Sequence, residues 1–120
     1  MKKALFILLV ILPCTLPVSV DAQRTVGNQL PLISAHRGAS RLAPENTKAS
    51  LLMAIDAGAD FLEIDVRTTA DGEQVIVHDK SLKRTTGLDS FVSETNFATI
   101  RKLTAGGWFG KDFIEEKVPT

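Results

Sequence analysis

Two histidines are the side chains of this sequence best suited to proton transfer, and each follows an apolar run. His36 is followed directly by Arg37 and a glycine, and His78 comes directly after Val75–Val77. Imidazole exchanges a proton near neutral pH, and a guanidinium presents a planar fork that matches two phosphate oxygens. The triplet that begins at His36 therefore indicates a site for an oxyanion such as a phosphate. A surface turn with an incidental histidine is the alternative.

Glu63 and Asp65 form a second candidate site because they lie two residues apart in an alternating segment. Residues two apart in a strand project from the same face, so both carboxylates would be within reach of one ion. Two carboxylates this close repel each other unless a cation lies between them, and oxygen-only donors favour Ca²⁺ or Mg²⁺. The alternative is a solvated strand face paired with Arg67. The opposite face is apolar and is expected to pack on helices; it consists of Leu62, Ile64 and Val66.

Three other groups of residues are weaker candidates for a functional role. Asp71–Gly72 is typical of a turn. Lys80, Lys83 and Arg84 form a basic run that we expect to be solvated, although one of them could line a phosphate site. Trp108–Phe109 is either part of the core or a wall of the substrate site.

Strands and a helix are expected to position these side chains. Apolar or alternating runs predict strands over residues 30–35, 61–67 and 75–77, the first of them buried. Helical spacing of apolar residues predicts a helix of roughly three turns between a turn and cap at 44–47 and Gly58. The chain after residue 80 is harder to interpret, and it is expected to contain the features that follow: a turn at 85–87, a short helix at 97–103 and a glycine-rich aromatic loop at 105–110.

The connection between the second and third strands predicts a hairpin. Residues 68–73 are too few for a parallel crossover, which takes a dozen or more residues. If the turn is centred near Ala70 and Asp71, the numbers of facing residues sum to about 141, as antiparallel pairing requires. That register places His78 opposite Glu63. The expected result is a cluster of carboxylates and imidazole.

Residues 1–22 are typical of a secretory signal, because two lysines precede an apolar run and a small residue closes the segment. Residues 23–29 then form a polar spacer before a domain over 30–120. A membrane anchor and a lipoprotein modified at Cys14 are less favoured, since prolines interrupt the apolar run and one of them precedes the cysteine. We therefore expect a secreted or periplasmic protein with no stable membrane span after cleavage.

The charge balance excludes several classes of partner. Without the leader, the 14 basic and 14 acidic side chains become 12 and 13, a net charge of −1. A nearly neutral domain lacks the electrostatic footprint of a nucleic-acid or anionic-membrane binder. Cys14 is the only cysteine, so the mature chain is expected to have no disulfide and no cysteine metal site.

Several motifs in fixed order resemble those of one known family. They are the segments 33–38 (ISAHRG), 44–47 (PENT), 58–60 (GAD), 63–66 (EIDV), 71–72 (DG), 78–79 (HD) and 84–87 (RTTG). Together they are similar to the amino-terminal part of a glycerophosphodiester phosphodiesterase. The resemblance extends to the later segments 107–109 (GWF) and 118–120 (VPT), so it covers nearly all of the chain after the leader.

This resemblance implies an α/β fold of the TIM-barrel type and metal-dependent hydrolysis of glycerophosphodiesters to an alcohol and sn-glycerol 3-phosphate. His36 and His78 would be the general acid and base, and Arg37 would bind the substrate phosphate. Glu63 and Asp65 would bind a divalent metal, Ca²⁺ or Mg²⁺. The partner would be a small-molecule glycerophosphodiester, with no nucleic acid involved.

Length is where the sequence departs from the family. A TIM barrel takes about 250 residues, so residues 30–120 would supply only the first three or so strands. The family's further carboxylate ligand comes from a later strand, and Glu115 and Glu116 lie too early to replace it. The sequence is therefore interpreted as a fragment or a truncated product that is inactive by itself. The alternatives are a non-catalytic secreted remnant and a related phospholipase of the phosphatidylinositol or sphingomyelinase D type.

Overall fold

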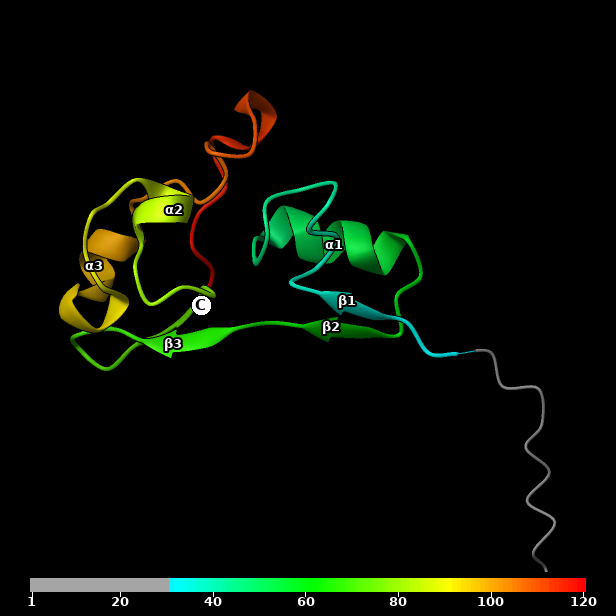
Figure 1. The fold of residues 1–120 in the computed structure, drawn as a ribbon, viewed down its shortest axis with the longest axis horizontal. Coiled ribbons are helices and arrows are strands. Elements are labelled where there is room, and N and C mark those ends of the chain that lie inside the picture. Colours follow the sequence, from blue (N-terminus) through cyan, green and yellow to red (C-terminus); the bar gives the residue numbers. More distant parts are fainter. Residues whose placement is uncertain (1–30) are drawn as a thin grey trace, which may run out of the picture. The chain divides into compact units, whose positions relative to one another are not determined.

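Two parallel strands and the helix between them form the first part of the structure, a computed structural model that describes residues 31–120. The expected signal and spacer, residues 1–22 and 23–29, lie outside the described residues. Strand β1 (Ser34–His36) pairs in parallel with β2 (Phe61–Glu63), and helix α1 (Lys48–Asp56) lies alongside them in Figure 1. Parallel neighbours require such a crossover.

Helix α1 begins and ends where the sequence predicts. Thr47 caps the amino terminus, since its hydroxyl accepts a hydrogen bond from the Ser50 amide at 3.3 Å. The Ser50 hydroxyl in turn accepts from the Thr47 amide, which completes a capping box. After the helix, Gly58 adopts a φ of 82°, a left-handed conformation typical of residues that end helices.

The expected strand over 61–67 is instead two strands that pair with different partners. Strand β2 pairs with β1, whereas β3 (Val66–Thr68) pairs in antiparallel fashion with β4 (Gln74–Ile76). Figure 1 shows β2 leading directly into β3 along one line. The chain changes its partner strand near Asp65, whose backbone amide donates to the Asn46 side chain at 3.3 Å.

The hairpin between β3 and β4 is confirmed, but its predicted register is wrong by one residue. Thr69 and Glu73 close a three-residue loop through a 2.8 Å bond from the Thr69 amide to the Glu73 carbonyl. Gly72, with a φ of 87°, supplies the left-handed residue that such loops use. The turn is therefore centred on Asp71, and His78 does not face Glu63.

Short helical segments and loops complete the described chain. They are the helices α2 (Lys83–Thr86) and α3 (Phe97–Ile100) and the 3₁₀ turns η1 (Val92–Glu94) and η2 (Lys111–Phe113). The predicted turn at 85–87 is the end of α2, where Gly87 has a φ of 81°. The predicted helix at 97–103 is shorter than expected, and residues 105–110 form no helix or strand. None of the helices within residues 31–120 has the length and apolar character needed to span a bilayer.

The buried apolar core lies in the second part of the described chain. Its members are Val75, Val77, Leu82, Val92, Ile100, Ala105 and Val118. The apolar face of residues 62–66 was expected to pack on helices, and this is wrong for the described residues. Leu62, Ile64 and Val66 are 38%, 41% and 52% exposed, and the members of the described core all come from residues 75–118.

Candidate active site

His36 and Glu63 are brought together by the parallel pairing of β1 and β2. They are register partners at the carboxyl ends of the two strands, and His36 Nε2 lies 3.3 Å from Glu63 Oε2. Both side chains are accessible, at 67% and 43% exposed. The pair therefore offers an imidazole and a carboxylate at an open strand end, where a ligand can reach both.

The turn after His36 is held tightly against the start of α1. Arg37 has a φ of 58°, which is uncommon for a residue with a side chain. Its carbonyl accepts hydrogen bonds from the Asn46 amide at 3.0 Å and the Ser50 hydroxyl at 3.1 Å. A Cβ on Gly38 would lie 2.6 Å from Ser50 atoms, so only glycine permits this approach. The cap of α1 thus fixes the backbone of the candidate phosphate-binding residue.

The Arg37 side chain lies between two carboxylates. Its Nη1 donates to Glu45 Oε1 at 3.1 Å, and its Nε lies 3.3 Å from Asp65 Oδ2. This Nε is buried, and it has no aligned hydrogen-bond acceptor within residues 31–120. The side-chain amide of Asn46 positions Asp65 instead, because its Nδ2 donates to the same Oδ2 at 2.9 Å. The guanidinium is therefore held by charge on two sides.

His78 follows β4 and is held through both its backbone and its ring. The Arg67 guanidinium donates to the His78 carbonyl, with Nε at 2.7 Å. The ring nitrogen Nδ1 lies 2.7 Å from Asp79 Oδ1. The ring itself is 43% exposed. A half-exposed imidazole on a carboxylate is suited to proton exchange with a ligand.

Arg84 is the site residue that sequence reasoning missed. The sequence predicts a solvated basic run in which one residue could line a phosphate site. The Arg84 guanidinium instead donates to Asp79 through Nε at 2.7 Å and to Glu45 through Nη2 at 2.7 Å. Its Cζ also lies 5.7 Å from the centre of the Trp108 ring. Arg84 belongs to the sequence motif 84–87, but its partner Glu45 lies 39 residues earlier in the chain. The solvated interpretation holds for the neighbouring Lys83, whose partner Asp89 is 77% exposed.

These contacts shift the pKa values of three side chains. The hydrogen bonds from Arg84 hold the pKa of Asp79 well below its usual range, with a smaller contribution from His78. Arg84 likewise lowers the pKa of Glu45, against the opposing effect of burial. The two carboxylates in turn raise the pKa of Arg84. All three groups therefore keep their charges at neutral pH.

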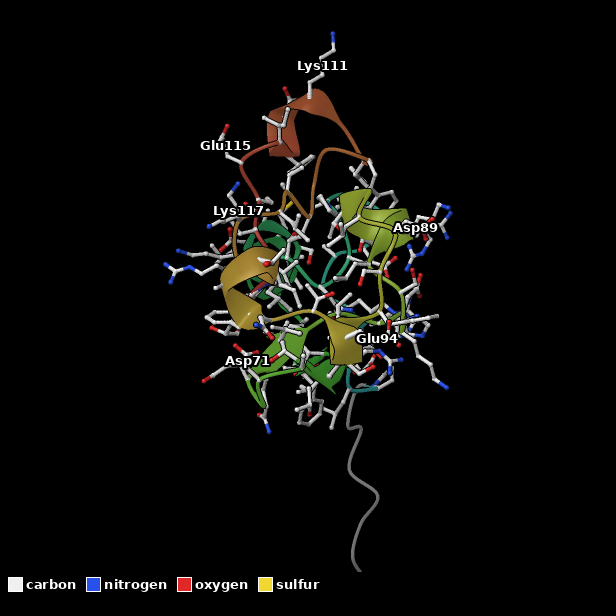
Figure 2. All side chains as sticks on the ribbon, turned by 90° about the vertical axis from the view of Figure 1, so that its left-hand side faces the viewer. Asp71, Asp89, Glu94, Lys111, Glu115 and Lys117 are labelled. Carbon is white, nitrogen blue, oxygen red and sulfur yellow. The ribbon has the colours of Figure 1, made fainter. Side chains whose placement is uncertain are left out.

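The described carboxylates fit a hard cation by type but not by number. Within residues 31–120, no group of three or more histidine, aspartate or glutamate side chains could hold a metal ion. Glu63 and Asp65 supply oxygen donors, whereas Ca²⁺ takes six to eight of them. Glu116 is engaged elsewhere, as its Oε2 accepts from the Ala49 amide at 3.3 Å, and Glu115 is labelled near η2 in Figure 2. Further ligands would have to come from other groups.

Four of the five predicted site residues are joined by direct contacts, and the fifth, His78, is connected to them through other charged side chains. His36 and Glu63 form one pair, and Arg37 joins it because its amide donates to the Glu63 carbonyl at 2.9 Å. Arg37 also contacts Asp65. His78 is linked to Arg37 through a chain of charged side chains, namely Asp79, Arg84 and Glu45.

Comparison with known proteins shows that this chain is similar to part of the glycerophosphodiester phosphodiesterases. The model of the glycerophosphoryl diester phosphodiesterase family matches residues 36–120. A glycerophosphodiester phosphodiesterase of Caldanaerobacter subterraneus subsp. tengcongensis is 45% identical over 89 residues, which is 74% of this chain and 37% of that protein. The chain thus spans little more than a third of the length of such relatives.

Solved structures show the same partial match. The crystal structure of glycerophosphodiester phosphodiesterase from Agrobacterium tumefaciens is 44% identical, with a TM-score of 0.74 over 75% of this chain and 39% of that one. The structure of an Oleispira antarctica phosphodiesterase in complex with the product sn-glycerol-3-phosphate is 46% identical, with a TM-score of 0.73 over 76% and 37% of the two chains. The described α/β structure therefore matches part of these proteins.

Proposed function

This chain belongs to the glycerophosphoryl diester phosphodiesterase family, and we propose that it supplies the amino-terminal part of the active site of a metal-dependent enzyme of that kind. The reaction is hydrolysis of a glycerophosphodiester to an alcohol and sn-glycerol 3-phosphate. The observation that carries the proposal is the contact chain that links the candidate phosphate-binding Arg37 to the candidate proton-transfer group His78. The relative with bound sn-glycerol-3-phosphate supports the choice of product.

The proposed fold of the whole enzyme is a TIM-type barrel with its site at the carboxyl ends of the strands. The parallel pair β1 and β2 ends at His36 and Glu63, as a site at that face requires. The apolar face of residues 62–66 is exposed within residues 31–120, and the outer helices of a complete barrel would cover it.

Arg37 is proposed to bind the substrate phosphate. Its guanidinium stays charged and offers five N–H groups in a fixed fork, which suits a phosphodiester. Glu45 and Asp65 hold that guanidinium in place before the substrate arrives. Preorganised charge of this kind contributes more to catalysis than charge that must be rearranged.

His36 and His78 are proposed to transfer the protons. One imidazole accepts the proton of a glycerol hydroxyl as its oxygen attacks phosphorus, and the other donates a proton to the departing alkoxide. The product of this step is a cyclic phosphate, which water then opens. A divalent ion held by Glu63, Asp65 and further donors would neutralise charge and make the hydroxyl more acidic. Each histidine lies beside a carboxylate, which stabilises its protonated form: the imidazolium that the base becomes and the imidazolium from which the acid starts.

The protein is proposed to be secreted or periplasmic, with residues 1–22 as a cleaved signal. The basis is the pair of lysines followed by an apolar run in the sequence. Determination of the amino-terminal residue of the exported protein tests this, and a mature chain that begins at Gln23 is the expected result.

A chimera with a complete relative tests the proposed function. Residues 36–120 replace the matching segment of the Agrobacterium tumefaciens enzyme, and release of sn-glycerol 3-phosphate from glycerophosphocholine is measured. Substitution of either histidine, His36→Ala or His78→Ala, should reduce turnover by about 10²–10⁴-fold, as expected for acid–base groups. An active chimera in which either substitution leaves turnover nearly normal would remove that histidine from the mechanism.

The 120-residue chain alone provides the complementary measurement. Its described residues offer too few donors for a metal ion, so it should hydrolyse glycerophosphocholine no faster than its His36→Ala variant, with or without millimolar Ca²⁺ or Mg²⁺. Metal-dependent turnover that is lost in the variant would show that the chain assembles a working site by itself or with a second copy.

A further inference from the structure

We propose that Arg84 is a positioning residue for His78, because it holds the carboxylate that fixes which ring nitrogen carries the proton. In this arrangement Nδ1 of His78 is protonated and donates to Asp79, and Nε2 is the basic nitrogen available to a ligand. The inference rests on the proposed function, in which His78 is one of the two proton-transfer groups.

The proton on Nδ1 follows from the contact with Asp79. His78 Nδ1 lies 2.7 Å from Asp79 Oδ1, within hydrogen-bond distance. An ionised carboxylate only accepts hydrogen bonds, so a neutral imidazole at this position must donate from Nδ1. Asp79 is ionised near neutral pH, and the hydrogen bonds from Arg84 lower the pKa of its carboxyl further. The basic nitrogen of the neutral ring is then Nε2.

The guanidinium of Arg84 fixes the orientation of the Asp79 carboxylate. Its Nε donates to Oδ2 at 2.7 Å and its Nη2 to Oδ1 at 3.1 Å, a two-point contact that sets the plane of the carboxylate. A single-point partner such as lysine would leave that plane free to rotate. Without Arg84, the Asp79 side chain could adopt other rotamers and His78 would lose its acceptor.

The guanidinium of Arg84 is itself held by Glu45 along a second edge and by Trp108 on one face. Its Nη1 and Nη2 donate to the two Glu45 oxygens at 3.0 and 2.7 Å. Glu45 Oε1 also accepts from Arg37 at 3.1 Å, and Trp108 lies against the guanidinium with its ring centre 5.7 Å from Cζ. The same side chain thus connects the proton-transfer group to the phosphate-binding group. A change at Arg84 should therefore alter His78 without a direct contact between them.

The tautomer of His78 is measured by NMR on the ¹⁵N-labelled 120-residue chain, at a pH where the rings are neutral. The chain has only two histidines, so a His36→Asn variant assigns the ring signals. The wild-type chain should show His78 mainly as the Nδ1–H form. In Arg84→Gln and Arg84→Lys, the share of the Nε2–H form should rise severalfold.

Arg101→Gln is the matched control, because Arg101 lies over the Phe97 ring, at 5.9 Å from its centre, and forms no ion pair within residues 31–120. It should leave the tautomer of His78 unchanged. If Arg84→Gln does not fold, the lysine variant decides the result. A wild-type chain with His78 mainly as Nε2–H, or a folded Arg84 variant with the wild-type tautomer, would overturn the proposal. Neither result depends on catalysis, so the measurement separates this inference from the proposed function.

Discussion

Residues 34–63 and residues 74–118, which carry the candidate catalytic groups, differ in the side chains that they bury. In the first region the fully buried side chains are polar or small, and Thr47 and Ser50 are completely inaccessible. Apolar side chains of α1 are open, with Leu52 49% and Ile55 54% exposed. In the second region His78 and Arg84 flank an apolar core. This difference indicates that hydrogen bonds stabilise the first region, whereas burial of apolar side chains stabilises the second.

Removal of a core side chain from the second region should have the largest effect on stability. Leu82 is completely buried, so Leu82→Ala should lower the free energy of unfolding by about 2–5 kcal/mol. Its matched control in the first region, Leu62→Ala, removes a side chain that is 38% exposed and should cost about 1 kcal/mol or less. Urea denaturation followed by circular dichroism measures both. Equal losses would show that the two regions do not differ in this way.

Gly38 offers the corresponding test of the first region. Gly38→Ala places a Cβ 2.6 Å from Ser50 at a φ of 77°, and the sum of strain and overlap should cost about 2–4 kcal/mol. Gly58→Ala is matched in conformation, with a φ of 82° and open space around it, so its cost should be about 1–2 kcal/mol. The same denaturation experiment compares them. Similar losses would mean that the approach of the 36–38 turn to α1 does not limit stability.

The sequence predicted the features that depend on neighbours along the chain. Thr47 and Ser50 form a local cap, so the start of α1 could be foreseen. The Asp71–Gly72 turn likewise predicted the hairpin. The register of the two strands could not be foreseen. It depends on which residues close the loop, and closure by Thr69 and Glu73 shifts the pairing by one residue from the predicted register.

The features that were missed depend on distant partners. Arg84 resembles Lys83 in type and position, yet only Arg84 contacts Glu45, 39 residues earlier. The strand over 61–67 was predicted as continuous because its alternation is unbroken in sequence. The change of partner strand from β1 to β4 depends on the tertiary structure, and the alternation of apolar and polar residues does not predict it. The roles of the five predicted site residues remain predictions, and the chimera tests those of His36 and His78.

Acid should weaken the contacts that join the two regions. Arg84 lowers the folded-state pKa values of Glu45 and Asp79 below their ordinary values of 4.5 and 3.8. A lowered folded-state pKa adds stability above the unfolded-state value, and that stability is lost as the pH falls through the folded-state value. The free energy of unfolding should therefore decrease from about pH 4.5 downward. In Glu45→Gln and Asp79→Asn the decrease should be smaller, and an unchanged acid slope in both variants would contradict the assignment.

The exposed ion pair beside Arg84 should contribute least. Lys83 Nζ lies 2.9 Å from Asp89 Oδ2, but the two side chains are 66% and 77% exposed, and Figure 2 shows Asp89 at the surface beside α2. Water and salt screen such a pair, so a double-mutant cycle of Lys83→Gln and Asp89→Asn should give a coupling of about 0.5 kcal/mol or less. The cycle for Arg84→Gln and Glu45→Gln should give a larger coupling, because Glu45 is only 13% exposed and receives two hydrogen bonds from Arg84. Equal couplings would mean that Arg84, like Lys83, is a solvated surface cation and does not join the two regions.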